Sequence, residues 1–182
     1  MTASPALAAV GLGASVGDRR ATLATALRAL DAAPGVEVVA VSRLYRTPPA
    51  GGVARGWFLN AVALLRTSLG PEPLLALLKA IEVRLGRRPA PRWADRVLDL
   101  DLLLLGRRVR AAPDPVLPHP RMADRAFVLV PLSEVAPGLC DPRTGRPFAL
   151  PAGGCRPVAV GVLAAPGRER PAARRRSPRR PR

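Results

Sequence analysis

Hydrophobic residues near the start of the chain form a short continuous run and then recur at helical spacing. Residues 6–12 are apolar and end in glycines, which is typical of a strand that leads into a loop. From Asp18 onward, leucines at positions 23, 27 and 30 lie on one face of a predicted helix, and the Pro-Gly pair at 34 and 35 ends it. The β-branched residues of 36–46 predict a second strand, which stops at the prolines that follow.

The middle of the chain continues this alternation of strands and helices. Residues 58–67 alternate well enough for a third strand, and residues 71–85 carry apolar side chains on one face of a helix that Gly86 ends. Residues 97–105 predict a fourth strand, and 122–135 a further short helix. The order βαββαβ predicts an α+β protein with a ferredoxin-like core, in which helices pack on a mainly antiparallel sheet.

The end of the chain has a different composition. After position 151 the apolar pattern weakens, and no further strand or helix is predicted there. Residues 166–182 contain eight arginines and one glutamate and have little apolar surface to bury. We therefore expect one domain at 1–165, followed by a disordered Arg- and Pro-rich tail at 166–182.

Two carboxylates interrupt the apolar fourth strand. Because side chains alternate along a strand, Asp99 and Asp101 point to one face with Cα atoms about 6.5 Å apart. The leucines at 98, 100, 102 and 104 are then expected to point the other way, into a core. Two parallel carboxylates repel each other, and hard divalent cations about 3.5 to 4 Å apart would stabilise the pair and hold the oxygens of a polyphosphate. The alternative is a half-exposed strand whose polar face is acidic.

The charge of the chain is high but unevenly spread. Its formal net charge is +16, yet the tail contains eight of the arginines, and Lys79 is the only lysine, so the basicity is a weak sign of nucleic-acid binding. Cys140 and Cys155 are too few for a disulfide framework or a zinc site, which fits a reducing cytoplasm. The N-terminus lacks a basic signal-peptide region, and no apolar run approaches about 18 residues. We expect a soluble cytoplasmic protein with no membrane partner.

The chain lacks two common nucleotide-binding motifs. The glycines at 11, 13 and 17 have the spacing GxGxxxG rather than the GxGxxG of a dinucleotide-binding turn, and the chain has no GxxxxGK[ST] motif. A nucleotide would therefore be held through metal ions and arginines. Arg92 and Arg96, just before the acidic pair, have the planar guanidinium groups that bind phosphate.

Several ordered motifs resemble one family. They are GLGASVGD, SRLYRTPPAGG, FLNAV, IEVRLGR, RWADRVLDLDLLLLG and LPHPRMADRAFVLVPLSEVAP. In this order they are similar to the 6-hydroxymethyl-7,8-dihydropterin pyrophosphokinase family of folate biosynthesis. The resemblance implies a ferredoxin-like enzyme that uses two Mg²⁺ ions to transfer the β,γ-diphosphate of ATP to the pterin hydroxymethyl group, releasing AMP.

The same resemblance implies roles for individual residues. It assigns catalysis to four residues, of which the aspartates are also the metal ligands: Arg87, Arg96, Asp99 and Asp101. It places ATP against six residues: Arg87, Arg92, Trp93, Arg96, His119 and Arg125. It places the pterin against six others: Thr47, Pro48, Ala50, Phe58, Asn60 and Phe127. Glu82 matches a family position beside the loop that carries the arginines, where it is otherwise an ordinary helix-end residue.

Two other interpretations remain open. A ferredoxin-like sheet with a basic tail is also typical of RNA-binding modules, but these stack bases on exposed sheet aromatics, and aromatic residues make up only 3% of this chain. A different metal-dependent nucleotidyl transferase would use the acidic pair without the pterin motifs. The family resemblance favours a monomer whose partners are ATP and the pterin, with no specific nucleic acid.

Overall fold

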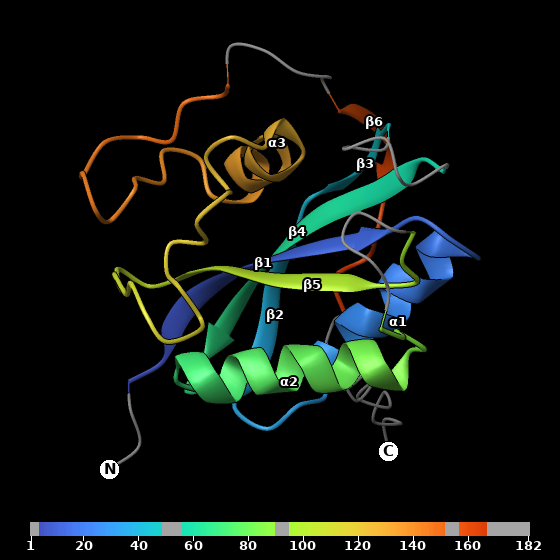
Figure 1. Ribbon diagram of the computed structural model, residues 1–182, viewed down its shortest axis with the longest axis horizontal. Helices are drawn as coiled ribbons and strands as arrows, with labels where there is room; N and C mark the ends of the chain where they lie inside the picture. Colours follow the sequence, from blue (N-terminus) through green and yellow to red (C-terminus); the bar gives the residue numbers. More distant parts are fainter. Residues whose placement is uncertain (1–3, 49–55, 90–94, 152–156, 167–182) are drawn as a thin grey trace, which may run out of the picture.

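The protein folds as a six-stranded sheet between two layers of helices. The computed structural model describes residues 4–48, 56–89, 95–151 and 157–166. Two helices, α1 (Arg19–Asp31) and α2 (Pro71–Arg84), lie on one face of the sheet, and α3 (Ala126–Val135) lies on the other (Figure 1). A hydrophobic core fills the space on each face.

The strand order is that of a ferredoxin-like fold, as the sequence predicts. The strands are β1 (Ala6–Ala14), β2 (Val36–Val41), β3 (Arg43–Thr47), β4 (Phe58–Thr67), β5 (Asp99–Leu105) and β6 (Val158–Val162). They lie in the order β5-β1-β4-β3-β6, with β2 also paired to β4, and every pairing is antiparallel. Strand β1 is therefore an interior strand, with β4 on one side and the edge strand β5 on the other.

Local chemistry explains both long helices. The Asp18 side chain caps α1 by accepting the N–H of Ala21 at 3.0 Å. Helix α2 begins with Pro71, whose fixed φ suits the first turn, and ends before Gly86, which has a φ of +95° that favours glycine. The leucines expected on the inner face of α1 are all buried: Leu23, Leu27 and Leu30.

The predicted strand at 36–46 is two strands. Ser42 separates β2 from β3: its hydroxyl accepts the N–H of Val62 at 3.0 Å and donates to the carbonyl of Arg43 at 2.8 Å. Both strands still pair with β4, so the topology does not change. The β-branched pattern was correct about strand character, but it held no signal for the break.

The alternation along β5 also changes part-way. Leu98, Leu100 and Leu102 lie in the core beneath α1 and α2, as expected. The register with β1 shifts between Ala9 and Val10, and Leu104 lies instead in the core beneath α3. The expectation for Leu104 was wrong because the irregularity inserts an extra residue and reverses the faces beyond it.

The ends of two other predictions also differ. The helix expected at 122–135 begins at Ala126, and Met122 lies in the preceding turn, where it is fully buried. Strand β6, which was not predicted, pairs with β3 at the edge of the sheet. Its valines at 158, 160 and 162 are exposed, so backbone pairing rather than apolar burial places it. In the described residues, no helix is long and apolar enough to cross a membrane.

Strand β6 should contribute to stability although it was not predicted. Removing residues 157–182 deletes β6 and the buried Leu163, and should lower the free energy of unfolding by about 2 kcal/mol or more, the scale of one buried leucine. Removing only residues 166–182 is the control and should leave the denaturant midpoint unchanged. Equal midpoints for both truncations would show that β6 adds nothing.

Candidate active site

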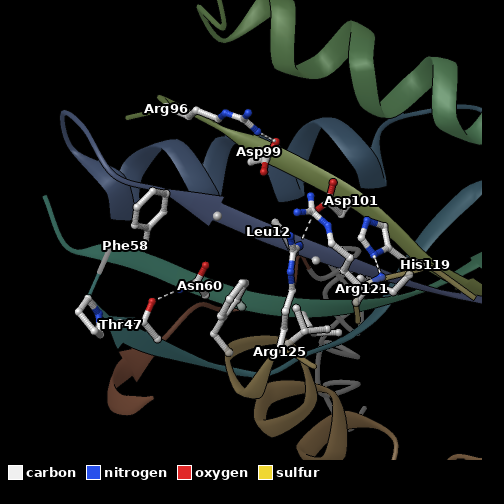
Figure 2. Close-up of a pocket in the computed structure, with 18 residues that line it drawn as sticks. Leu12, Thr47, Phe58, Asn60, Arg96, Asp99, Asp101, His119, Arg121 and Arg125 are labelled. Carbon is white, nitrogen blue, oxygen red and sulfur yellow. Dashed lines mark hydrogen bonds and ion pairs between the residues drawn. The ribbon is translucent and has the colours of Figure 1, made fainter. Parts of the chain in front are cut away.

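One pocket brings together most of the residues that the family resemblance selects. It lies on the α3 side of the sheet, over β1, β4 and β5 (Figure 2). Its lining includes Gly11 and Gly13 of β1, which face Asp101 and Asp99 across the β1–β5 pairing. A Cβ atom at Gly13 would lie 3.2 Å from Oδ1 of Asn60, so glycine keeps the floor of the pocket open.

The strand register places an amide on one side of Gly13 and a carboxylate on the other. This residue pairs with Asn60 of β4 on one side and with Asp99 of β5 on the other. We call the part of the pocket beside β5 the charged end, and the part beside Asn60, Thr47 and Phe58 the aromatic end (Figure 2). A ligand that spans β1 would contact both ends.

Asp99 and Asp101 point into the charged end from β5 and are each about 30% exposed, at 28% and 32% of the side chain. Asp99 Oδ1 accepts a hydrogen bond from Arg87 at 2.8 Å. It also accepts one from Arg96 at 3.0 Å (Figure 2). Asp101 Oδ2 lies 3.8 Å from a guanidinium nitrogen of Arg125. Arginines therefore balance both carboxylates, and two of them, Arg96 and Arg125, also line the pocket.

Glu82 fixes the backbone between the two aspartates. This glutamate is only 1% exposed, and its Oε1 accepts the N–H of Leu100 at 2.6 Å. Lys79 donates both to Glu82 at 2.9 Å and to the carbonyl of Leu100 at 3.0 Å. Oε2 of Glu82 lies 2.5 Å from Arg87, so one buried carboxylate holds both β5 and an arginine that contacts Asp99.

The position of Glu82 within the helical pattern already indicates that this carboxylate is buried and needs partners. Glu82 follows Ile81 and lies four positions after Leu78, so it occupies the apolar, inward face of α2. A carboxylate on a buried helix face needs partners, and such a residue is a candidate for a structural or functional contact.

The segment before α3 supplies the other side of the charged end. The His119 N–H donates to the carbonyl of Leu103 at 2.9 Å, which ties this segment to β5. Nδ1 of His119 accepts the N–H of Arg121 at 3.3 Å. Burial lowers the pKa of His119 below its ordinary value, and the nearby Asp101 carboxylate partly opposes this effect. Arg121 also lines the pocket, although the sequence did not single it out.

The aromatic end contains Phe58 from β4, Phe127 from α3 and a paired amide. The Asn60 amide donates to the Thr47 hydroxyl at 2.8 Å, which fixes its orientation and leaves Oδ1 on the side of Gly13 (Figure 2). Arg125 lies over the ring of Phe127, 5.5 Å from its centre. This end therefore offers flat apolar surfaces and a fixed polar group, which suits a planar heterocycle.

Comparison with known proteins agrees with the motifs. The model of the 7,8-dihydro-6-hydroxymethylpterin-pyrophosphokinase (HPPK) family matches residues 9–137. The chain belongs to the HPPK family. It is 47% identical to the 2-amino-4-hydroxy-6-hydroxymethyldihydropteridine pyrophosphokinase of Methylorubrum extorquens, over 71% of this chain and 82% of that protein. It is 41% identical to the protein of the same name from Bacillus subtilis, over 71% of this chain and 77% of that protein.

Solved structures agree with this HPPK fold. Wild-type HPPK-DHPS of Plasmodium falciparum aligns with a TM-score of 0.60 at 14% sequence identity, over 80% of this chain. The alignment covers 44% of that chain, so the present chain spans less than half of the longer protein. A structure of HPPK-DHPS in complex with substrates aligns with a TM-score of 0.62 at 11% identity, over 80% of this chain and 42% of that one.

Most of the residues that the HPPK resemblance selects line this one pocket. They are Thr47, Pro48, Phe58, Asn60, Arg96, Asp99, Asp101, His119, Arg125 and Phe127. Arg87 contacts Asp99 directly but does not line the pocket. Ala50, Arg92 and Trp93 lie outside the described residues, so their roles stay predictions.

The contact between Glu82 and β5 should dominate the stability of this HPPK site. Glu82→Ala should lower the free energy of unfolding by about 3 kcal/mol or more, because it leaves Lys79, Arg87 and the Leu100 N–H without their buried partner. Glu72→Ala on the same helix is the control, since Glu72 pairs with Arg110 but is 58% exposed, and should cost less than about 1 kcal/mol. Urea unfolding of both variants measures the difference; similar losses would contradict it.

Proposed function

We propose that this chain transfers the β,γ-diphosphate of ATP to the hydroxymethyl group of 6-hydroxymethyl-7,8-dihydropterin and releases AMP, as a step of folate biosynthesis. The observation that carries the proposal is the register Asn60–Gly13–Asp99, which aligns an amide beside two phenylalanines with an acidic, arginine-lined site across one glycine. The names of the relatives and the family match support the same reaction.

The aromatic end suits the pterin. A pterin is a flat bicycle with donors and acceptors along its edge, so it binds well between aromatic faces with an amide at that edge. We assign the faces to Phe58 and Phe127, and the edge contact to Asn60. Thr47 holds the Asn60 amide by a 2.8 Å hydrogen bond, so the amide oxygen is oriented before the ligand arrives. Pro48 and Ala50 complete our assignment of this end.

The charged end suits a triphosphate. Phosphoryl transfer needs the attacking hydroxyl in line with the leaving group and stabilisation of charge on the phosphate oxygens, rather than a covalent intermediate. We assign Arg96 and Arg87 to the transferred phosphates and to the charge that develops during transfer. His119, Arg125, Arg92 and Trp93 are assigned to the remainder of ATP.

The acidic pair fits magnesium. Mg²⁺ usually binds one or two carboxylates and takes its other ligands from water and substrate phosphates, and Asp99 and Asp101 supply such a pair within the pocket. No third carboxylate, histidine or cysteine of the described residues joins them to form a metal-binding group. When bound with ATP, two Mg²⁺ ions would neutralise phosphate charge and orient the leaving group.

The arginine contacts of Asp99 fit this assignment. Arg87 and Arg96 balance the carboxylate before substrates bind, since both donate to Asp99 Oδ1. An incoming polyphosphate offers the same guanidinium groups more negative charge and two oxygens for each planar fork. We infer that both arginines turn from Asp99 toward phosphate, which frees the carboxylate for the metal. The residues that line the pocket all lie between positions 11 and 128, so we propose residues 1–165 as the catalytic unit, and we propose that it acts as a monomer.

The proposal is tested by incubating the protein with ATP, Mg²⁺ and 6-hydroxymethyl-7,8-dihydropterin, and separating the nucleotides. We expect AMP and the pterin diphosphate in equal amounts, and no AMP without the pterin or without Mg²⁺. Asp99→Asn and Asp101→Asn should keep the fold and lose magnesium-dependent turnover by about 10² or more, since each removes a charged metal ligand.

Glu37→Gln is the control for these variants. It removes an exposed carboxylate, paired with Arg66 on the strands, that is 42% exposed and not in the pocket, so turnover should stay near that of the wild type. ADP as the product, or full activity of either aspartate variant, would contradict the proposed reaction or the metal assignment respectively.

Substitutions at the two ends of the pocket should affect different steps, pterin binding at the aromatic end and transfer at the charged end. Phe127→Ala should weaken pterin binding by about 1 to 3 kcal/mol through lost stacking and burial, with ATP affinity nearly unchanged. Arg96→Ala should lower kcat by about 10² or more while the affinities change less, because the guanidinium meets charge that develops during transfer. Isothermal titration of each ligand and single-turnover rates measure both effects.

Matched controls for this pair lie outside the pocket. Phe148→Ala removes a phenylalanine packed against the core beneath α3, and Arg66→Ala removes an arginine whose side chain is 53% exposed. Neither should change pterin affinity or the transfer rate. An Arg96 variant that loses pterin affinity and keeps its rate would show that this arginine only shapes the pocket.

A further inference from the structure

Ser15, the residue after β1, forms several hydrogen bonds with one residue that is distant in the sequence. It is 1% exposed and contacts Arg96, 81 positions away. The Ser15 N–H donates to the Arg96 carbonyl at 2.9 Å, and the Arg96 N–H donates to the Ser15 hydroxyl oxygen at 2.8 Å. The hydroxyl in turn lies 3.3 Å from the Arg96 carbonyl as a donor. Ser15 thus satisfies both backbone polar groups of Arg96.

This contact sets the starting point of the Arg96 side chain. The guanidinium of Arg96 reaches Asp99 Oδ1 at 3.0 Å, and Asp99 pairs with Gly13 of β1. The Ser15–Arg96 and Gly13–Asp99 contacts therefore join the same two segments, one after the other. The arginine extends from a backbone position that Ser15 fixes, toward a carboxylate whose position β1 also fixes.

Ser15 is itself held from the opposite side. Its carbonyl accepts a hydrogen bond from Nε of Arg19, the first residue of α1, at 2.8 Å. A chain of hydrogen bonds thus runs from the start of α1 through Ser15 and Arg96 to Asp99.

We propose that Ser15 is a positioning residue for diphosphate transfer: its hydroxyl holds the backbone of Arg96 so that the guanidinium stays aimed at the charged end of the pocket. The inference rests on the proposed function. A long arginine side chain amplifies a small backbone displacement, and a misplacement of about 1 Å at a reacting group costs up to about 10²-fold in rate. Ser15 touches no substrate in this assignment and acts through Arg96.

Ser42 provides a matched control within the same sheet. It is also 1% exposed, and its hydroxyl also accepts a backbone N–H, from Val62 at 3.0 Å, and donates to a backbone carbonyl, of Arg43 at 2.8 Å. It does not line the pocket. Ser15→Ala and Ser42→Ala therefore remove the same kind of buried hydroxyl, and only the first removes it from Arg96.

The experiment compares single-turnover transfer rates, ligand affinities and melting temperatures of five proteins: wild type, Ser15→Ala, Ser42→Ala, Arg96→Ala and the double variant of Ser15 and Arg96. Ser15→Ala should slow transfer about tenfold with pterin and ATP-analogue affinities within about twofold, while Ser42→Ala keeps the rate. In the Arg96→Ala background, Ser15→Ala should slow transfer no further, because the group that Ser15 positions is gone.

Two additional measurements keep the outcome decisive. If Ser15→Ala does not fold, Ser15→Cys retains the volume with a weaker hydrogen-bonding group and should still be slower than wild type. The Arg96 Nε–H signal in NMR, assigned by its absence in Arg96→Ala, should shift or broaden in the Ser15 variants and not in Ser42→Ala. This readout needs no turnover, so it separates failure of the inference from failure of the proposed reaction, which would appear as an inactive wild type.

A wild-type rate in Ser15→Ala, an equal slowing by Ser42→Ala, or a further slowing in the Arg96→Ala background would each overturn the proposal. An unchanged Arg96 signal in Ser15→Ala would do the same.

Discussion

The structure depends on the placement of two carboxylates on a strand whose other face is buried. Asp99 and Asp101 share one side of β5, while Leu98 and Leu100 lie in the core beneath the two long helices. This arrangement is stable because neighbouring side chains offset the carboxylate charges and pair with the backbone between them. Arginines balance the two charges, and the buried Glu82 accepts the N–H of the residue between them. Stability and chemistry therefore use the same contacts.

Strand β1 organises the rest of the site. Two glycines of β1 face the pocket, and each pairs with an aspartate of β5. A larger residue at Gly13 would meet the Asn60 amide, so this side of the sheet is not filled by its own side chains. Helices α1 and α2 supply a full core on the opposite face, while α3 covers this face only in part (Figure 1). The open remainder is the pocket.

The positions of individual arginines say more about the site than the net charge of the chain does. The net charge of +16 would suit a nucleic-acid partner. However, the last 17 residues alone, with eight arginines and one glutamate, carry a net charge of +7. The arginines that matter for the site are few, and each has a defined position. Arg96 is held through its backbone by Ser15, Arg87 through its side chain by Glu82, and Arg125 lies beside Asp101 and over Phe127.

The sequence alone determined the order of the elements from β1 to α3, with β2 and β3 taken as one strand, and that Asp99 and Asp101 share one face of β5, because these follow from local periodicity. Its ordered motifs also identified the family, and ten of the predicted site residues line one pocket. Tertiary structure decided the break at Ser42, the shifted register that moves Leu104, and the pairing of β6. It also decided the contacts of Glu82 and Ser15, whose partners lie 18 and 81 positions away. Periodicity reports which face a side chain occupies, but only the packed chain determines which distant group lies opposite it.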